Sequence, residues 1–179
     1  ESCKALTNGS YNTAVGYSSL GTNLSGAANV AVGYHAALSL KGSYNVAVGK
    51  SALYAAGTVD RTIAIGFNAL NQMGTGDDSI AIGSSALATH TVGSRNIAIG
   101  TAAMADTNAT AAADGGDSGT PGTLASTDNV FIGYNSGGGI WAGSDSNFNV
   151  AVGNYTMDAV MDGALNNTAV GHLALSALT

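Results

Sequence analysis

Charged residues are scarce in this sequence, at 9% of 179 residues, and it has one proline and one cysteine. The single cysteine, Cys3, excludes an intramolecular disulfide and a cysteine-based metal site, and leaves an idle side chain or a link to a neighbouring molecule. The net charge is −6, without the basic stripe that neutralises nucleic-acid phosphates. No apolar run approaches the roughly 18 residues of a membrane span. The composition therefore predicts neither nucleic-acid binding nor membrane insertion by this segment.

The main feature of the sequence is a repeated motif. A five-residue segment resembling Asn-Val-Ala-Val-Gly occurs nine times, from Asn12–Gly16 to Asn167–Gly171, and its glycines step by 17, 16, 17, 17, 17, 33, 20 and 18 residues. A second half-motif, usually Ala-Leu as in Ala52-Leu53, follows most of these glycines, but the Gly133 copy has Ser136-Gly137 instead. A fixed period of this length is typical of stacked repeat architectures.

Each period predicts one coil of a parallel β-solenoid. The β-branched residues favour a strand, and Gly and Asn favour turns, so each coil is expected to read strand, turn, short strand, turn. One coil cannot bury its own apolar face, and stacking builds the core. We therefore expect a single all-β domain over residues 1–179, a parallel β-solenoid of about ten coils with a 16–17-residue repeat and loop insertions at about 105–128 and 137–147.

Side-chain alternation along a strand predicts two different faces. The Val or Ile residues that flank the central residue are expected to stack into an interior ladder. The central residue is alanine in eight of the nine copies, which indicates a surface packed closely against it. That surface is either another subunit, which we favour, or the other half of the same coil. The alanines are Ala14, Ala31, Ala47, Ala64, Ala81, Ala98, Ala151 and Ala169.

The asparagine that starts the strand predicts a further ladder. Stacked side-chain amides at this position are expected to bond the backbone of adjacent coils, which is a structural role rather than ligand binding. The asparagines are Asn12, Asn29, Asn45, Asn96, Asn129, Asn149 and Asn167. Tyr17, Tyr34, Phe67 and Tyr134, each just after a repeat glycine, are expected to form a partial stacking ladder.

These motifs resemble the YadA-like head repeats of trimeric autotransporter adhesins. They are also similar to the Asn-Thr-Ala-Val-Gly-Tyr repeats of phage tail fibres and bacterial surface fibre proteins, to which the segment from Asn12 to Leu20 is closest. The resemblance covers nearly the whole chain outside the two interruptions. It implies a left-handed parallel β-roll, usually trimeric, on a cell or virion surface.

The interruptions hold the remaining candidate sites. Acidic residues such as Asp114 and Asp117 lack the spacing of a known calcium loop, so we expect no metal and no cofactor. Trp141 lies in a Gly-rich stretch, where its ring either stacks on a sugar, with Asp145 and Asn147 bonding hydroxyls, or packs against the protein. No nucleophile elbow and no helical His-Glu pair is present.

The sequence therefore predicts a non-enzymatic, structural or adhesive fibre subunit. Its expected partner is itself, as a homotrimer or as a head-to-tail filament, at an extracellular, cell-surface or virion location. The alternative hypothesis is a glycan- or receptor-binding head module of a tail fibre or adhesin, with a cell-surface glycan as partner and Trp141 at the contact.

Overall fold

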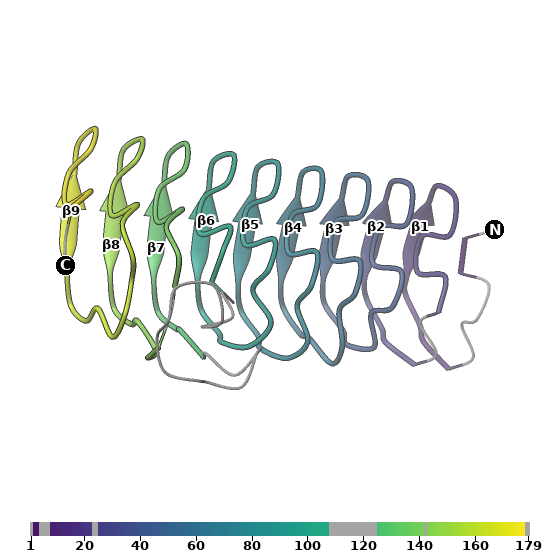
Figure 1. Cartoon of the computed structure of the whole chain (residues 1–179). Helices are drawn as coiled ribbons and strands as arrows, with labels where there is room; N and C mark the ends of the chain where they lie inside the picture. Colours follow the sequence, from purple (N-terminus) through teal and green to yellow (C-terminus); the bar gives the residue numbers. More distant parts are fainter. Residues whose placement is uncertain (1, 4–7, 23–24, 108–124, 142, 178–179) are drawn as a thin grey trace.

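The chain forms one parallel β-solenoid in the computed structural model, which describes residues 2–3, 8–22, 25–107, 125–141 and 143–177. Nine three-residue strands form a single sheet in the order β1 to β9, stacked along one axis as Figure 1 shows. The strands are β1 Thr13–Val15, β2 Val30–Val32, β3 Val46–Val48, β4 Ile63–Ile65, β5 Ile80–Ile82, β6 Ile97–Ile99, β7 Val130–Ile132, β8 Val150–Val152 and β9 Thr168–Val170.

The repeat sets the register of the sheet. Every strand pairs in parallel with the next, so that the central residues face one another, as Ala64 does with Ala47 and with Ala81. Nine strands define about eight turns rather than the ten expected. At about 4.8 Å per coil, the first and last strands lie about 38 Å apart.

The long gap between Gly100 and Gly133 adds no rung to the sheet. β6 pairs directly with β7, with Ile97 opposite Val130 and Ala98 opposite Phe131. Residues 108–124, which carry most of the first expected insertion, lie outside the described residues. The additional length therefore accounts for the lower number of turns, because the gap supplies no coil of its own to the sheet.

The second half of each coil is a turn and not the short strand expected. In the β5 coil, Ser85 and Leu87 both have left-handed backbone conformations, with φ of 57° and 50°. Such angles are uncommon for residues with a side chain, and they bend the chain sharply. The turn is still tied to the next coil, because the Leu87 amide donates to the Ala103 carbonyl at 3.0 Å.

The glycine after each strand is required by both conformation and space. Gly66 has φ of +136°, and a Cβ atom there would lie 2.4 Å from the Gly83 carbonyl oxygen in the next coil. Neighbouring coils thus approach at this corner more closely than any side chain permits. This explains the glycine in the eight copies of the motif that are followed by another coil.

Candidate assembly surface

The central alanines of the strands lie inside the solenoid and not on its surface. Ala31, Ala47, Ala64, Ala81 and Ala98 are completely buried within the single chain. The expectation that this column packs against another subunit is therefore wrong, and the alternative, the other half of the same coil, is correct. The alanines belong to the same buried cluster as the turn residues Leu20, Leu53, Leu70 and Leu87.

The β7 coil demonstrates that the two columns face each other. Here the central alanine is replaced by Phe131, and the turn leucine is replaced by Gly137. A Cβ atom on Gly137 would lie 2.5 Å from Cδ1 of the Phe131 ring. The large side chain has therefore moved from the turn to the strand, and the narrow interior holds one large residue and one small residue in either case.

The Val and Ile residues form the outer surface of the sheet, contrary to the expected interior ladder. Because side chains alternate along a strand, a buried central alanine directs both neighbours outward. Val15 is 57% exposed, and Ile65, Ile132 and Val152 are each 36–37% exposed. We call this surface the Val/Ile face. It consists of Thr13, Val15, Val30, Val32, Val46, Val48, Ile63, Ile65, Ile80, Ile82, Ile97, Ile99, Val130, Ile132, Val150, Val152, Thr168 and Val170.

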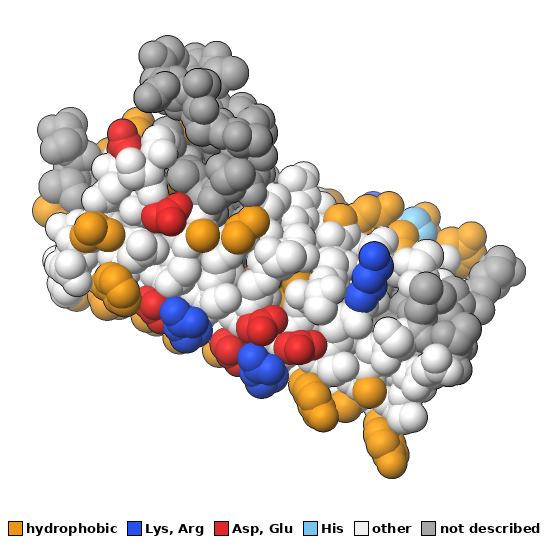
Figure 2. Space-filling model, turned by 90° about the horizontal axis from the view of Figure 1, so that it is seen from below, with side chains coloured by type: hydrophobic (Ala, Val, Ile, Leu, Met, Phe, Trp, Pro, Cys, Tyr) orange, Lys and Arg blue, Asp and Glu red, His pale blue; other side chains and the backbone are white. Residues whose placement is uncertain are grey.

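One residue per coil, two positions before each strand, forms an edge beside the Val/Ile face. We call this row the pre-strand rim, and it consists of Tyr11, Ala28, Tyr44, Arg61, Asp78, Arg95, Asp128, Phe148 and Asn166. All nine have left-handed φ angles between 53° and 63°. Tyr11, Tyr44 and Phe148 are 92%, 66% and 55% exposed. Figure 2 shows charged side chains gathered in the middle of this side of the molecule, with hydrophobic ones on either side.

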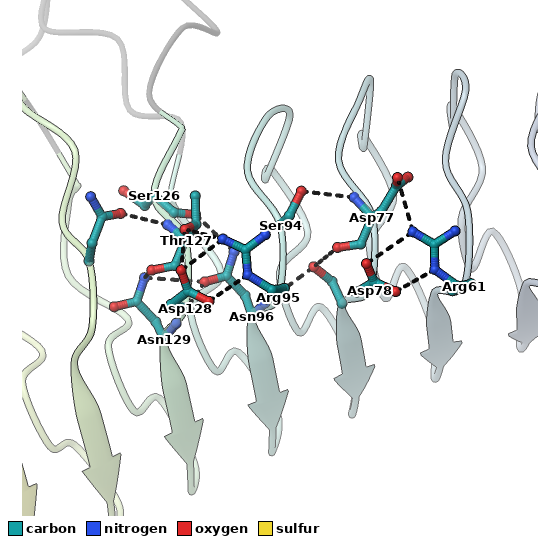
Figure 3. A network of polar contacts seen from close by, with 12 residues as sticks. Arg61, Asp77, Asp78, Ser94, Arg95, Asn96, Ser126, Thr127, Asp128 and Asn129 are labelled. Atoms are coloured by element: carbon teal, nitrogen blue, oxygen red, sulfur yellow. Dashed lines mark hydrogen bonds and ion pairs between the residues drawn. The ribbon is translucent and has the colours of Figure 1, made fainter.

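Ion pairs connect neighbouring coils within the pre-strand rim, as Figure 3 shows. Arg61 Nε donates to Asp78 Oδ1 at 2.6 Å, and Arg61 Nη2 donates to Asp78 Oδ2 at 3.0 Å. Arg95 binds Asp128 in the same bidentate way, at 2.6 and 2.9 Å. Hydrogen bonds from the arginines hold the pKa of both aspartates below its ordinary value. Exposed pairs of this kind add little stability, but they fix the orientation of the rim.

The residue directly after each repeat glycine forms the opposite edge, the post-strand rim. It consists of Tyr17, Tyr34, Lys50, Phe67, Ser84, Thr101, Tyr134, Asn154 and His172. The Tyr17 and Tyr34 rings stack at 5.5 Å between centroids, and the Lys50 ammonium lies 5.6 Å from the Phe67 ring centroid. The expected aromatic ladder is thus present in part, between Tyr17 and Tyr34.

The expected asparagine ladder is confirmed, and its role is structural. Asn29 Oδ1 accepts from the Asn45 backbone amide at 2.9 Å, and Asn45 Oδ1 accepts from the Thr62 amide at 2.9 Å. The Asn45 side-chain amide also donates to the Val59 carbonyl at 2.7 Å. The same pattern runs from Asn96 through the later asparagines. These bonds satisfy buried backbone groups at a corner where no sheet ladder reaches.

Trp141 is buried, so the packing alternative holds at this position and the glycan contact does not. Only 1% of the side chain is exposed, and its Nε1 atom donates to the Gly137 carbonyl at 2.8 Å. Its ring meets the Phe131 ring edge-on at 5.5 Å. Asp145 and Asn147 are occupied by neighbouring coils: their side-chain oxygens accept from the amides of Ala125 and Thr127, each at 2.7 Å.

Several buried polar residues lie outside the ladder in the described part of the chain, and among them His90 is the one with a titratable side chain. Its Nδ1 atom lies 2.9 Å from Thr107 Oγ1, and its Nε2 atom lies near the Gly93 carbonyl and the Asn96 side chain. Burial lowers the pKa of His90 to about 4. Among the described residues, His, Cys, Asp and Glu form no group of three suited to a metal ion.

Sequence reasoning found the aromatic positions of the post-strand rim but missed the pre-strand rim, although a signal for it was present. Arg61, Asp78 and Arg95 are separated by 17 residues, the same step as their glycines, which places opposite charges on adjacent coils. The described residues include no helix long and apolar enough to cross a membrane. Comparison of the chain with protein-family models, with curated proteins and with solved structures finds no match in any of the three.

Proposed function

We propose that this chain is a non-catalytic structural subunit of a surface or extracellular fibre, in which copies of the chain associate through the Val/Ile face. The observation that carries the proposal is the orientation of the strands. They direct their largest apolar side chains outward and retain alanine for the core. An isolated chain gains less from this arrangement than from the reverse one, because burial of a Val or Ile contributes about 1.5–3 kcal/mol.

The extent of the face supports an interface between copies. Apolar residues occupy both outward columns in β2 to β8 without a charged side chain among them. The face therefore extends over about 30 Å of the rod, at 4.8 Å per coil. Continuous apolar patches of this kind on soluble proteins mark interaction sites. A repetitive face fits a repetitive partner, and the chain itself is the partner with the same spacing.

The work of such a subunit is reach and rigidity, and adhesion would follow from many weak contacts along the fibre. A receptor-binding head was the second hypothesis, and its contact was the Trp141 ring. Because that ring is buried, no observation on the described residues favours this alternative.

The test is to place charge at the centre of the Val/Ile face. Ile65→Glu and Ile82→Glu, singly and together, leave the strand and the core alanines in place. We expect the assembled wild-type protein to become monomeric, measured by light scattering across a range of concentrations, with rods or fibres lost in electron microscopy. Gln72→Glu, on an exposed turn residue, adds the same charge away from the face and is the control. A wild-type chain that is monomeric at every concentration would contradict the proposal.

A further inference from the structure

Two pairs of tyrosine rings lie in contact on neighbouring coils. The chain has seven tyrosines, all within the described residues. Tyr17 and Tyr34 belong to the post-strand rim, and their rings stack with 5.5 Å between centroids and 13° between planes. Tyr134 lies 5.2 Å from Tyr155 in the next coil, but these two rings meet edge-on, at 72°. The chain thus carries one face-to-face pair and one edge-to-face pair at almost the same separation.

The solenoid holds the stacked pair in register. The Gly33 amide donates to the Val15 carbonyl at 2.8 Å, and the His35 amide donates to the Tyr17 carbonyl at 2.9 Å. Inter-coil hydrogen bonds therefore lie on both sides of the point where the two rings leave the backbone. The rings nevertheless stay open to solvent, because Tyr17 is 57% exposed and Tyr34 is 48% exposed.

Other side chains that oxidants attack readily are shielded in this fold. Trp141 is 1% exposed, and all four methionines of the chain are buried within the solenoid. The methionines are Met73, Met104, Met157 and Met161. The remaining sulfur atom, on Cys3, is half-buried. Because oxidation depends on access, an oxidant in solution reaches the tyrosine rings before the indole and the thioethers.

The stacked geometry suits the coupling of two tyrosyl radicals. Loss of one electron and the phenolic proton leaves the unpaired electron shared between the oxygen and its ortho carbons, in orbitals perpendicular to the ring plane. Face-to-face rings direct these orbitals at each other, whereas an edge-on ring directs C–H bonds at its neighbour. A bond then forms between two ortho carbons, each of which loses its proton while each phenol oxygen regains one. Two tyrosines and one hydrogen peroxide thus give one dityrosine and two waters.

We propose that Tyr17 and Tyr34 form a site of oxidative cross-linking, at which a peroxidase-type one-electron oxidant joins their ortho carbons as a dityrosine. The link closes the loop of residues 17–34 and holds the β1 and β2 coils together covalently. A closed loop restricts the unfolded chain, so the cross-linked protein has a higher urea midpoint. This inference goes beyond the proposed function and does not depend on it, because both rings belong to one chain.

The test treats the full chain, carrying Cys3→Ser, with a peroxidase and hydrogen peroxide. Chymotrypsin cleaves after Leu20 and so separates the two tyrosines into different peptides. Mass spectrometry then identifies the linked peptides, which weigh two hydrogens less than the separate peptides together, and dityrosine fluorescence confirms the bond. Tyr17→Phe and Tyr34→Phe are the matched controls, since each retains the stacked ring but lacks the phenolic hydrogen. On a denaturing gel the product runs as a single chain, apart from any chains linked to one another.

We expect the Tyr17–Tyr34 link to be the main product and to be lost in either phenylalanine variant. An equal yield of a Tyr134–Tyr155 link would overturn the selection by ring geometry. Coupling of Tyr34 to the His35 ring, whose centroid lies 3.9 Å away, or links between chains alone, would overturn the site. Tyr11, which is 92% exposed, reports that the oxidant has acted. Oxidised Tyr11 beside an unlinked pair would therefore also overturn the proposal, whether the chain is monomeric or assembled.

Discussion

The β5 coil and the β7 coil solve the same packing problem in opposite ways. In the β5 coil the strand contributes Ala81 and the turn contributes Leu87, both fully buried. In the β7 coil the strand contributes Phe131 and the turn contributes Gly137. Both coils pair with their neighbours in the same register. The interior thus constrains the combined volume of the two positions, and not the identity of either one.

The corner that follows the turn also differs between the regular coils and the β7 coil. In the regular coils this corner holds side chains of varied size, such as Met73 and His90, and in the β7 coil it holds Trp141. The indole packs against the Phe131 ring and donates to the Gly137 carbonyl. The β7 coil therefore has an aromatic core in place of an aliphatic one, although its outer face retains Val130 and Ile132.

The largest expected effect concerns what both coils share, the glycine after the strand. Gly66→Ala and Gly133→Ala each place a Cβ atom within 2.4 Å of a carbonyl oxygen in the next coil. Since the obstructing atom is backbone, the stack must open there. We expect a loss of about 5 kcal/mol or more in the free energy of unfolding, measured by urea denaturation. An equal loss in both variants would show that the two kinds of coil differ in their cores and not at this glycine.

Gly171→Ala is the matched control for this prediction. Gly171 also has positive φ, at 119°, but nothing in the described structure lies within 4 Å of a Cβ atom built on it. Only the backbone strain remains, which amounts to about 1–3 kcal/mol. If all three variants lost the same amount, close stacking would not be the reason for the glycines.

The exchange between Phe131 and Gly137 predicts strong coupling. Phe131→Ala leaves a cavity beside Trp141 and is expected to cost about 3–5 kcal/mol. Gly137→Leu drives a side chain into the phenyl ring and is expected to cost about 1–3 kcal/mol or more. The double variant recreates the core of a regular coil, and leucine tolerates this left-handed position, as Leu87 shows. We expect it to recover most of the loss in a double-mutant cycle. Additive losses would contradict a shared volume.

The corner residue His90 predicts a dependence on acid that the β7 corner lacks. Folding lowers the pKa of His90 from 6.5 to about 4 because burial disfavours the charged ring. Its neighbours are the neutral groups of Thr107, Gly93 and Asn96. The stability contributed by neutral His90 is therefore complete above pH 6.5 and is lost as the pH falls toward 4, by up to about 3 kcal/mol.

The measurement is the urea midpoint as a function of pH, for the wild type and for His90→Met. Methionine occupies the equivalent corner at Met73, so the variant retains an apolar group of similar length. We expect its stability to change less between pH 6.5 and 4 than that of the wild type. Identical slopes in the two proteins would place the acid dependence elsewhere.

The sequence predicted the solenoid, its register and the asparagine ladder, because each follows from a motif that recurs nine times along the chain. It did not predict which strand face points inward. Both faces are apolar, so polarity does not distinguish the inner face from the outer one, and the larger residues were expected to form the core. Residue size decides which face points inward, because the space opposite the turn leucine accepts only alanine. The paired departures at Phe131 and Gly137 carried this information, because compensating residues are expected to touch.

The turns were beyond prediction for a different reason. Leucine and methionine at φ near 50° contradict local preference, as at Leu70 and Met104. These angles are held by inter-coil hydrogen bonds and burial, which only the stacked fold supplies. The rims could not be assigned either, because their place beside the Val/Ile face depends on which strand face is outside.

The smallest expected effect tests the regularity of the asparagine ladder. The ladder is interrupted at Thr62. Its backbone amide donates to Asn45 Oδ1, as the amide of an asparagine at this position does, but its hydroxyl donates only to the nearby Asp60 carbonyl, at 3.2 Å. In Thr62→Asn, the new side-chain amide is placed to donate to Asn45 Oδ1, as Asn45 itself does to Asn29 Oδ1 at 3.0 Å. We expect a gain of about 1 kcal/mol, and Asn45→Ala should lose about twice as much because it leaves the buried Thr62 amide unpaired. A lower urea midpoint for Thr62→Asn would mean that the corner at β4 is too tight for an amide. The interruption would then be a packing requirement of that coil, as Gly137 is in the β7 coil.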